Sequence, residues 1–288
     1  MDASFFLIQT LNGVQYGFLL FLVASGLTLI FGIMGVINLA HGSFYMIGAY
    51  LAFWLVRETG SFALALVLGL VVALAVGWLV ERVLIRHLYA RDHLYQVLLT
   101  YGLILIFNEG QRLIWGNDVH GVLIPSSLTG SIPLTEAQAY PIYRLFMSAC
   151  CIAVAAGMYL LIQHTRLGMT IRAGASNREM VEALGLDIDR LFALVFSLGA
   201  ALAAFAGMLS APVSSVYPGM GEQILIYSFV VVVIGGIGSI KGALVGALLI
   251  GLADTFARVL LPQVSGLTIY ALMAMVLVWR PLGLFGRR

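Results

Sequence analysis

Long apolar runs follow one another along the whole chain, separated by short polar stretches. The runs lack the alternation of apolar and polar residues that is typical of membrane barrel strands, and otherwise only helices satisfy their backbone groups within lipid. The pattern therefore predicts an all-α polytopic membrane protein with about eight to nine transmembrane helices. The expected spans are 6–31, 36–56, 62–80, 94–115, 140–162, 189–209, 223–240, 243–260 and 267–280.

Composition supports a membrane protein. Of the 288 residues, 61% are hydrophobic and 10% are charged, whereas soluble domains have about 25% charged residues. No low-complexity stretch or Pro/Gly/Ser-rich linker divides the chain, so we expect a single transmembrane domain over residues 1–288. The formal net charge of +2 is too small to indicate a nucleic-acid partner.

Basic residues predict the orientation of the chain in the bilayer. Three regions that lie on one side of a nine-span arrangement contain most of them: Arg82, Arg86 and Arg91; Arg166, Arg172, Arg178 and Arg190; and Arg280, Arg287 and Arg288. The opposite loops, 57–61 and 116–139, contain only Arg57. Because cytoplasmic loops are enriched in Lys and Arg, we expect a cytoplasmic C-terminus and an N-terminus that faces outward.

Two glycine-rich segments, 35–43 and 235–242, interrupt the apolar pattern about two hundred residues apart. Transporters often contain two broken or re-entrant segments that line the substrate route, but tight cytoplasmic turns also favour glycine. Both interpretations remain open from the sequence. The candidate residues of the translocation pathway are Asn38, His41, Gly42, Gly235, Gly236 and Gly238.

Two pairs of opposite charges fall inside predicted spans. Glu109 and Arg112 are three residues apart, and Asp254 and Arg258 are four apart, so each pair shares one helix face. Ionisable groups within a span are functional candidates. Because each acid already has a basic partner, a structural anchor is favoured over a proton relay.

The loop 163–188 is predicted to contain a docking helix. Ser176 and Glu179 form a capping box, Gly185 supplies a left-handed stop, and the helix between them spans 177–184. Such a short helix is marginal alone, so we expect it to dock. A protein groove is favoured over the membrane surface, because the acidic residues would lie against an anionic leaflet. The expected docking residues are Arg178, Glu179, Met180, Val181, Glu182, Ala183, Leu184 and Gly185.

Signatures of catalysis and metal binding do not stand out in the sequence. Lys241 is the only lysine, and the glycines around it do not have the P-loop spacing. The five histidines are scattered without a zinc motif, and the adjacent Cys150 and Cys151 are expected to be packing residues. We therefore expect neither an enzyme, nor a metal site, nor a cofactor in this chain. If transport uses ATP and Mg²⁺, separate subunits must bind them.

Three sequence blocks resemble a known family. They are Gly26-Leu-Thr-Leu-Ile-Phe-Gly32 leading into Gly35-Val-Ile-Asn38-Leu-Ala-His41-Gly42, the loop motifs between Thr165 and Arg190, and Gly235-Gly-Ile-Gly238-Ser-Ile-Lys241-Gly242. In this order they are similar to LivH-type permeases of branched-chain amino-acid ABC importers. Met169 departs from the glycine or basic residue expected there, which marks a divergent copy. The resemblance covers about residues 12–280.

The resemblance implies a multi-pass permease of a bacterial inner membrane that moves hydrophobic, branched-chain amino acids. Its implied partners are a second homologous, LivM-like permease, two ABC ATPase subunits and a periplasmic amino-acid-binding protein, with the lipid bilayer around them. The docking helix would be the coupling helix, and Asn38 and His41 would line the route. The alternatives are an ABC permease for urea or amides, and a stand-alone secondary carrier or channel that uses the charged pairs or His41.

Overall fold

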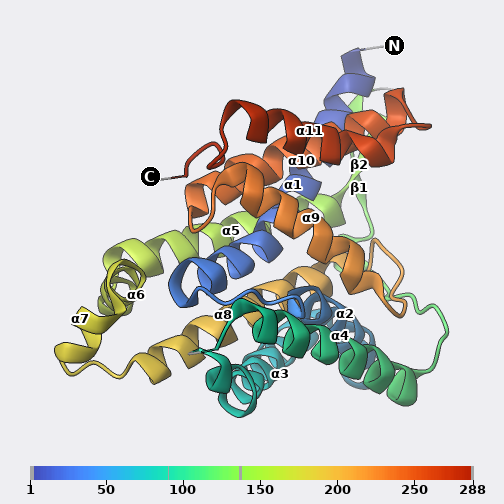
Figure 1. The fold of residues 1–288 in the computed structure, drawn as a ribbon. Coiled ribbons are helices and arrows are strands. Elements are labelled where there is room, and N and C mark those ends of the chain that lie inside the picture. The colour runs from blue at the N-terminus through green and yellow to red at the C-terminus, as the bar shows by residue number, and fades with distance from the viewer. Residues whose placement is uncertain (1–2, 90, 136–137, 287–288) are drawn as a thin grey trace.

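The computed structural model describes residues 3–89, 91–135 and 138–286. These residues form eleven α-helices, two short 3-10 helices and one antiparallel hairpin (Figure 1). The elements are α1 (Ala3–Met34), α2 (His41–Thr59), α3 (Phe62–Val83), η1 (Ile85–Leu88), α4 (His93–Trp115), η2 (Ser126–Leu128), β1 (Ser131–Thr135), β2 (Gln138–Pro141), α5 (Ile142–His164), α6 (Arg166–Ser176), α7 (Arg178–Ala183), α8 (Ile188–Ser210), α9 (Met220–Gly235), α10 (Ile240–Leu260) and α11 (Ser265–Trp279).

The multi-pass helical fold is confirmed, with the β1–β2 hairpin as an unexpected addition. Within the described ranges, six helices are long and apolar enough to cross a membrane: α1, α3, α4, α5, α8 and α10. Helices α9 and α11 are apolar but shorter. Each of the nine predicted runs overlaps a helix, although residues 36–40 and 236–239, which two of the runs include, are not helical. The count of eight to nine crossings stays a prediction.

Helix α8 forms the centre of the structure and packs against α1, α2 and α3 (Figure 1). Glycines allow this close approach, as is common between membrane helices. Gly26 of α1 meets Gly199 of α8, and a Cβ on Gly48 of α2 would collide with the backbone of Ala204. On the other side of α1, α10 approaches as closely through Gly251, and α9 and α11 pack on α10.

Helix α2 begins beside the middle of α1 and not at its end. Met34 ends α1, Gly35 reverses the chain with a φ of +65°, and the next residues run without helical structure. The His41 Nε2 atom then lies 2.9 Å from the carbonyl oxygen of Val23. With a rise of about 1.5 Å per residue, α2 starts about 16 Å back along α1 from its C-terminal end.

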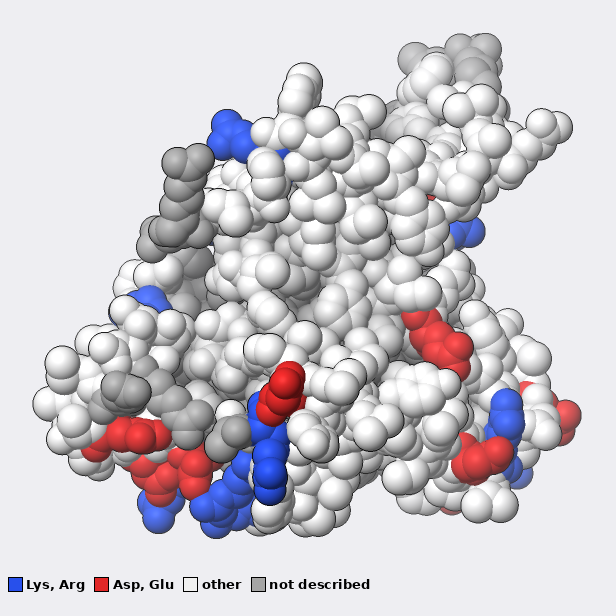
Figure 2. Space-filling view, viewed as in Figure 1, with Lys and Arg blue, Asp and Glu red and all other residues white. Residues whose placement is uncertain are grey.

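The helix assembly has two ends, which we call the α7 end and the hairpin end. At the α7 end lie α6, α7, the α9–α10 turn and the tail after α11, where Leu284 N donates to the carbonyl of Ile234 (2.8 Å). At the hairpin end lie β1, β2 and a bridge between His120 and Val216. Figure 2 shows most charged side chains in the lower part of the view, with a broad uncharged face above them.

Candidate functional site

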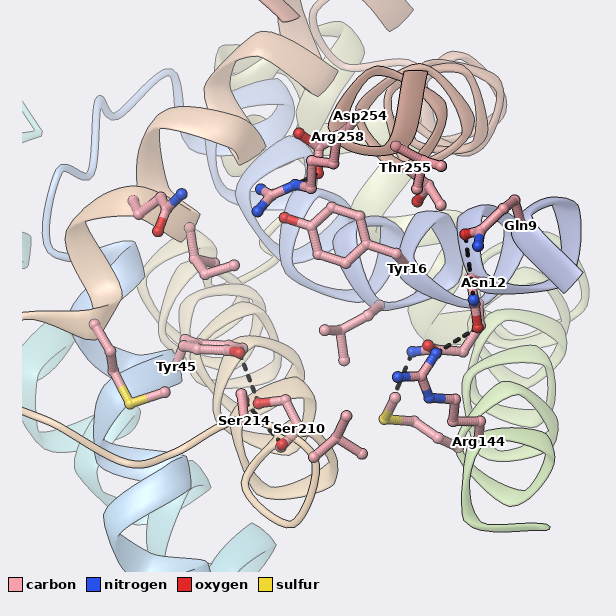
Figure 3. Close-up of a pocket in the computed structure, with 18 of the residues that line it drawn as sticks. Gln9, Asn12, Tyr16, Tyr45, Arg144, Ser210, Ser214, Asp254, Thr255 and Arg258 are labelled. Atoms are coloured by element: carbon pink, nitrogen blue, oxygen red, sulfur yellow. Dashed lines mark hydrogen bonds and ion pairs between the residues drawn. The ribbon is translucent and has the colours of Figure 1, made fainter. Parts of the chain in front are cut away.

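A polar cavity of about 460 Å³ lies at the hairpin end, between α1, α2, α5, α8, α9 and α10 (Figure 3). Its apolar lining includes Leu19, Met147, Met220 and Ile224. Val213 and Val259 add to this apolar lining, and hydroxyl, amide and charged groups make up the rest of the wall. Such a mixture suits a small solute with both polar and apolar parts, because a few placed polar groups orient a ligand within an apolar pocket.

The α1 wall of the cavity contains Gln9, Asn12 and Tyr16. Their spacing of three and four residues places them on one face of the helix. Asn12 donates to the Gln9 side-chain oxygen (3.5 Å) and accepts a hydrogen bond from Arg144 of α5. Figure 3 shows this chain of contacts crossing from α1 to α5. These residues are not among the candidates predicted from the sequence, although polar side chains that recur at helical spacing within the run 6–31 could have indicated them.

The opposite wall joins α2 to α8. The Tyr45 hydroxyl lies 2.6 Å from the Ser210 hydroxyl, and Ser210 donates to the carbonyl of Gly207 (3.0 Å). Because the Ser210 proton is used there, Tyr45 donates to Ser210. Ser214 donates to the carbonyl of Ser210 (2.9 Å). Hydroxyl groups therefore form hydrogen bonds both within the end of α8 and from α2 to α8.

On α10, Asp254 and Arg258 form the pair that the sequence predicts, with the Arg258 Nε atom 2.7 Å from a carboxylate oxygen. The Asp254 side chain is 5% exposed, whereas that of Arg258 is 54% exposed. Both line the cavity, and Figure 3 shows the Tyr16 hydroxyl directed toward them. A buried carboxylate whose partner keeps free donors in the cavity can exchange contacts with a charged solute.

Glu109 and Arg112 also contact each other, at 3.4 Å, but lie away from this cavity. Both side chains are largely exposed at the hairpin end of α4, and neighbouring Asn108 donates to Glu222 (3.2 Å). A pair as exposed as this contributes little to stability in water.

The candidate pathway residues of the two glycine-rich segments, 35–43 and 235–242, do not line the polar cavity. We call these segments the first and the second break. Asn38 and His41 are fully buried. Within the described part of the chain, neither the Asn38 amide nor His41 Nδ1 has a hydrogen-bond partner. Just before them, Ile37 N donates to Gln96 of α4 (3.3 Å). Gly42 packs directly on Gly221 of α9.

The second break is a tight turn at the α7 end. Gly236 and Gly238 have φ angles of +99° and +76°, which favour glycine. Gly235 packs on Gly242 of the next helix, and a Cβ on Gly32 of α1 would lie 2.8 Å from Gly238 Cα. The first break therefore ends beside Val23 near the middle of α1, and the second lies beside Gly32 near its end. Their place in a translocation pathway stays a prediction.

The loop 163–188 differs from the prediction in its helices. It contains α6 as well as α7, and Ser176 is the last residue of α6. The predicted capping box is wrong: Asn177, in extended backbone, is the N-cap, and its side-chain oxygen accepts from Met180 N (3.0 Å). The left-handed stop is confirmed, because Gly185 has a φ of +79° and donates to the carbonyl of Glu182 (2.9 Å).

The apolar side chains of α7 and of its C-cap residue Leu184 divide between two faces. Val181 is 2% exposed and packs with Ile171 and Ile188. Met180 and Leu184 are 58% and 73% exposed. We call these two residues the α7 patch. The side chains of Arg178 and Glu179, both predicted docking residues, lie outside the described residues.

Comparisons with known proteins give a consistent result. The family described as "Branched-chain amino acid transport system / permease component" matches residues 9–277. The chain is 33% identical to the high-affinity branched-chain amino acid transport system permease protein BraD of Pseudomonas aeruginosa, and 33% identical to LivH of Escherichia coli K12. Each match covers 98% of this chain and 96% of the relative. The ribose import permease protein RbsC of E. coli K12 is 28% identical over 87% of this chain and 78% of its own length. No solved structure matches.

Proposed function

Because the chain belongs to the family of permease components of branched-chain amino acid transport systems, we propose that it works as half of a membrane conduit. It is a permease subunit of a multi-pass inner-membrane ABC transporter for branched-chain amino acids. A second, LivM-like permease completes the conduit. Separate ATPase subunits bind ATP and Mg²⁺, and a periplasmic binding protein delivers the amino acid.

The α7 end faces the cytoplasm in this proposal. Along the described ranges, eight arginines belong to this end by their position in the chain: Arg82, Arg86, Arg91, Arg166, Arg172, Arg178, Arg190 and Arg280. Four belong to the hairpin end: Arg57, Arg112, Arg144 and Arg258. Cytoplasmic enrichment in basic residues supports this orientation, with a cytoplasmic C-terminus.

The polar cavity is the outward-facing part of the route. A branched-chain amino acid has a carboxylate, an ammonium group and an apolar side chain. Arg258 and Asp254 provide opposite charges for the first two, and Leu19 and Ile224 provide an apolar surface for the third. Segment 35–42 then acts as a re-entrant element, because α2 starts near the middle of α1 with buried polar side chains.

The α7 patch transmits the action of the ATPase. This is supported by one observation above all: a six-residue helix, capped at both ends, presents Met180 and Leu184 to solvent while Val181 holds it on the protein. Exposed apolar side chains at such a place mark a contact with another protein. The ATPase cleft would bury them.

The function is tested by reconstitution into liposomes. The chain together with its second permease, the ATPases and the binding protein should take up radiolabelled leucine, isoleucine or valine only when ATP is present. The chain alone should transport none of them. Uptake by the chain alone, driven by an ion gradient, would instead identify a secondary carrier.

A further inference from the structure

A groove between α3 and α8 is not used by the proposed transport mechanism. On α3 its lining residues are Leu74, Ala75, Trp78 and Arg82, and on α8 they are Arg190, Ala193, Leu194 and Ser197. On each helix these residues recur at intervals of three or four, so they form one stripe. The groove therefore follows the seam between two antiparallel helices and ends at two arginines.

Beside the groove lies an apolar cavity of about 410 Å³. Leu74 lines both spaces. The deeper lining comes from α3, α5 and α8 with Leu29 and Ile171, and includes Gly157, Leu198 and Phe205. From Arg190 to Phe205 the stripe on α8 extends about 22 Å. That length exceeds half of a hydrocarbon core about 30 Å thick, which is the depth reached by the acyl chain of one leaflet.

Charge distinguishes the mouth of the groove from its interior. Arg82 and Arg190 are both exposed, and among the described residues no carboxylate lines the groove. Arg190 contacts Asp187 at 2.8 Å, but both side chains are exposed and the pair is weak. The nearby acids are otherwise engaged, since Asp189 accepts from Arg86 and Glu81 accepts from the Tyr89 hydroxyl.

We propose that this groove binds an anionic phospholipid, with the headgroup phosphate between Arg82 and Arg190 and one acyl chain along the groove into the apolar cavity. Guanidinium groups bind phosphate through paired N–H donors. Trp78 lies just inside the arginines, at the level where tryptophan is enriched in membrane proteins. Basic pockets between membrane helices are typical sites for anionic headgroups.

The test is native mass spectrometry of the purified full-length chain, titrated with phosphatidylglycerol or phosphatidylcholine of equal chain length. We expect tighter binding of phosphatidylglycerol. Each arginine should contribute about fivefold, so the double variant Arg82→Gln/Arg190→Gln should weaken phosphatidylglycerol binding by about 25-fold. The matched control Arg57→Gln/Arg112→Gln, at the hairpin end, should leave it unchanged. Equal binding of both lipids, or preserved selectivity in the double groove variant, would overturn the proposal.

A second variant tests the acyl chain. Gly157 lines the cavity, and a Cβ added there would meet nothing within 4 Å, so Gly157→Leu is chosen to reduce the space for an acyl chain. This variant should weaken binding of long-chain phosphatidylglycerol and leave the dioctanoyl lipid unaffected. Gly102→Leu, at another open glycine, is the control. Binding that does not depend on chain length would indicate a simple phosphate site and overturn the proposal. So would groove variants that shift the monomer–dimer ratio instead of lipid binding, because the groove would then be a contact between two copies.

Discussion

Leu184 is the residue of the α7 patch whose contribution to docking can be estimated most directly. Its side chain is 73% exposed, so nearly three quarters of its surface remains available to a partner. Burying a whole leucine side chain stabilises by about 1.5–3 kcal/mol, and the available share corresponds to about 1–2 kcal/mol. Leu184→Ala should therefore raise the Kd between the permease and its ATPase by about 5- to 30-fold.

The assay is a binding titration of the ATPase subunit against the permease in nanodiscs, with thermal unfolding measured on the same samples. Leu184→Ala should leave the unfolding temperature unchanged, because the exposed side chain adds little to the fold. Leu113→Ala is the matched control, since Leu113 is 86% exposed on α4 toward the hairpin end. A Kd that stays within about twofold of the parent for Leu184→Ala, equivalent to about 0.4 kcal/mol, would refute the reasoning.

Three further predictions follow from the packing and the cavity. Gly48→Ala should lower the unfolding temperature, because its Cβ would overlap the Ala204 backbone at a cost of about 1–3 kcal/mol. Gly102→Ala lies in open space and should raise the unfolding temperature through a helix-propensity gain of about 1 kcal/mol. Equal shifts of the unfolding temperature in the two variants would contradict the packing argument. Val181→Ala should destabilise α7 and not only its docking, because Val181 packs inside the loop; hydrogen exchange of residues 178–184 should accelerate. Asp254→Asn should reduce amino-acid uptake while ATPase binding persists, because it removes one charge from the cavity wall; unchanged uptake would exclude the cavity from the route.

The sequence was sufficient for the long apolar helices and for the charged pairs, but not for α6. The length of an apolar run indicates whether a helix can cross a membrane. The pairs Glu109–Arg112 and Asp254–Arg258 follow from the spacing of their residues on one helix. Gly185 was also predictable, because a helix stop with positive φ strongly favours glycine.

What the sequence could not show depends on how helices from distant parts of the chain meet. Asn12 and Arg144 lie 132 residues apart, and Tyr45 and Ser210 lie 165 apart, so no local pattern connects the walls of the cavity. Either Ser176 or Asn177 is a good N-cap by residue type. Asn177 caps α7 because α6 continues through Ser176. Burial of Val181 likewise depends on α6 and α8, which lie outside its own helix.

In the proposed mechanism, a separate ATPase drives this permease through the α7 patch. Simultaneous measurement of ATP hydrolysis and amino-acid uptake, in vesicles that contain the assembled transporter with Met180→Asp, tests it most directly. Met180 is exposed, so the charged variant should fold and insert normally, yet its uptake should fall by about tenfold or more for each ATP hydrolysed, because a carboxylate is costly to bury in an apolar cleft. Parental uptake per ATP in the assembled variant would contradict the account.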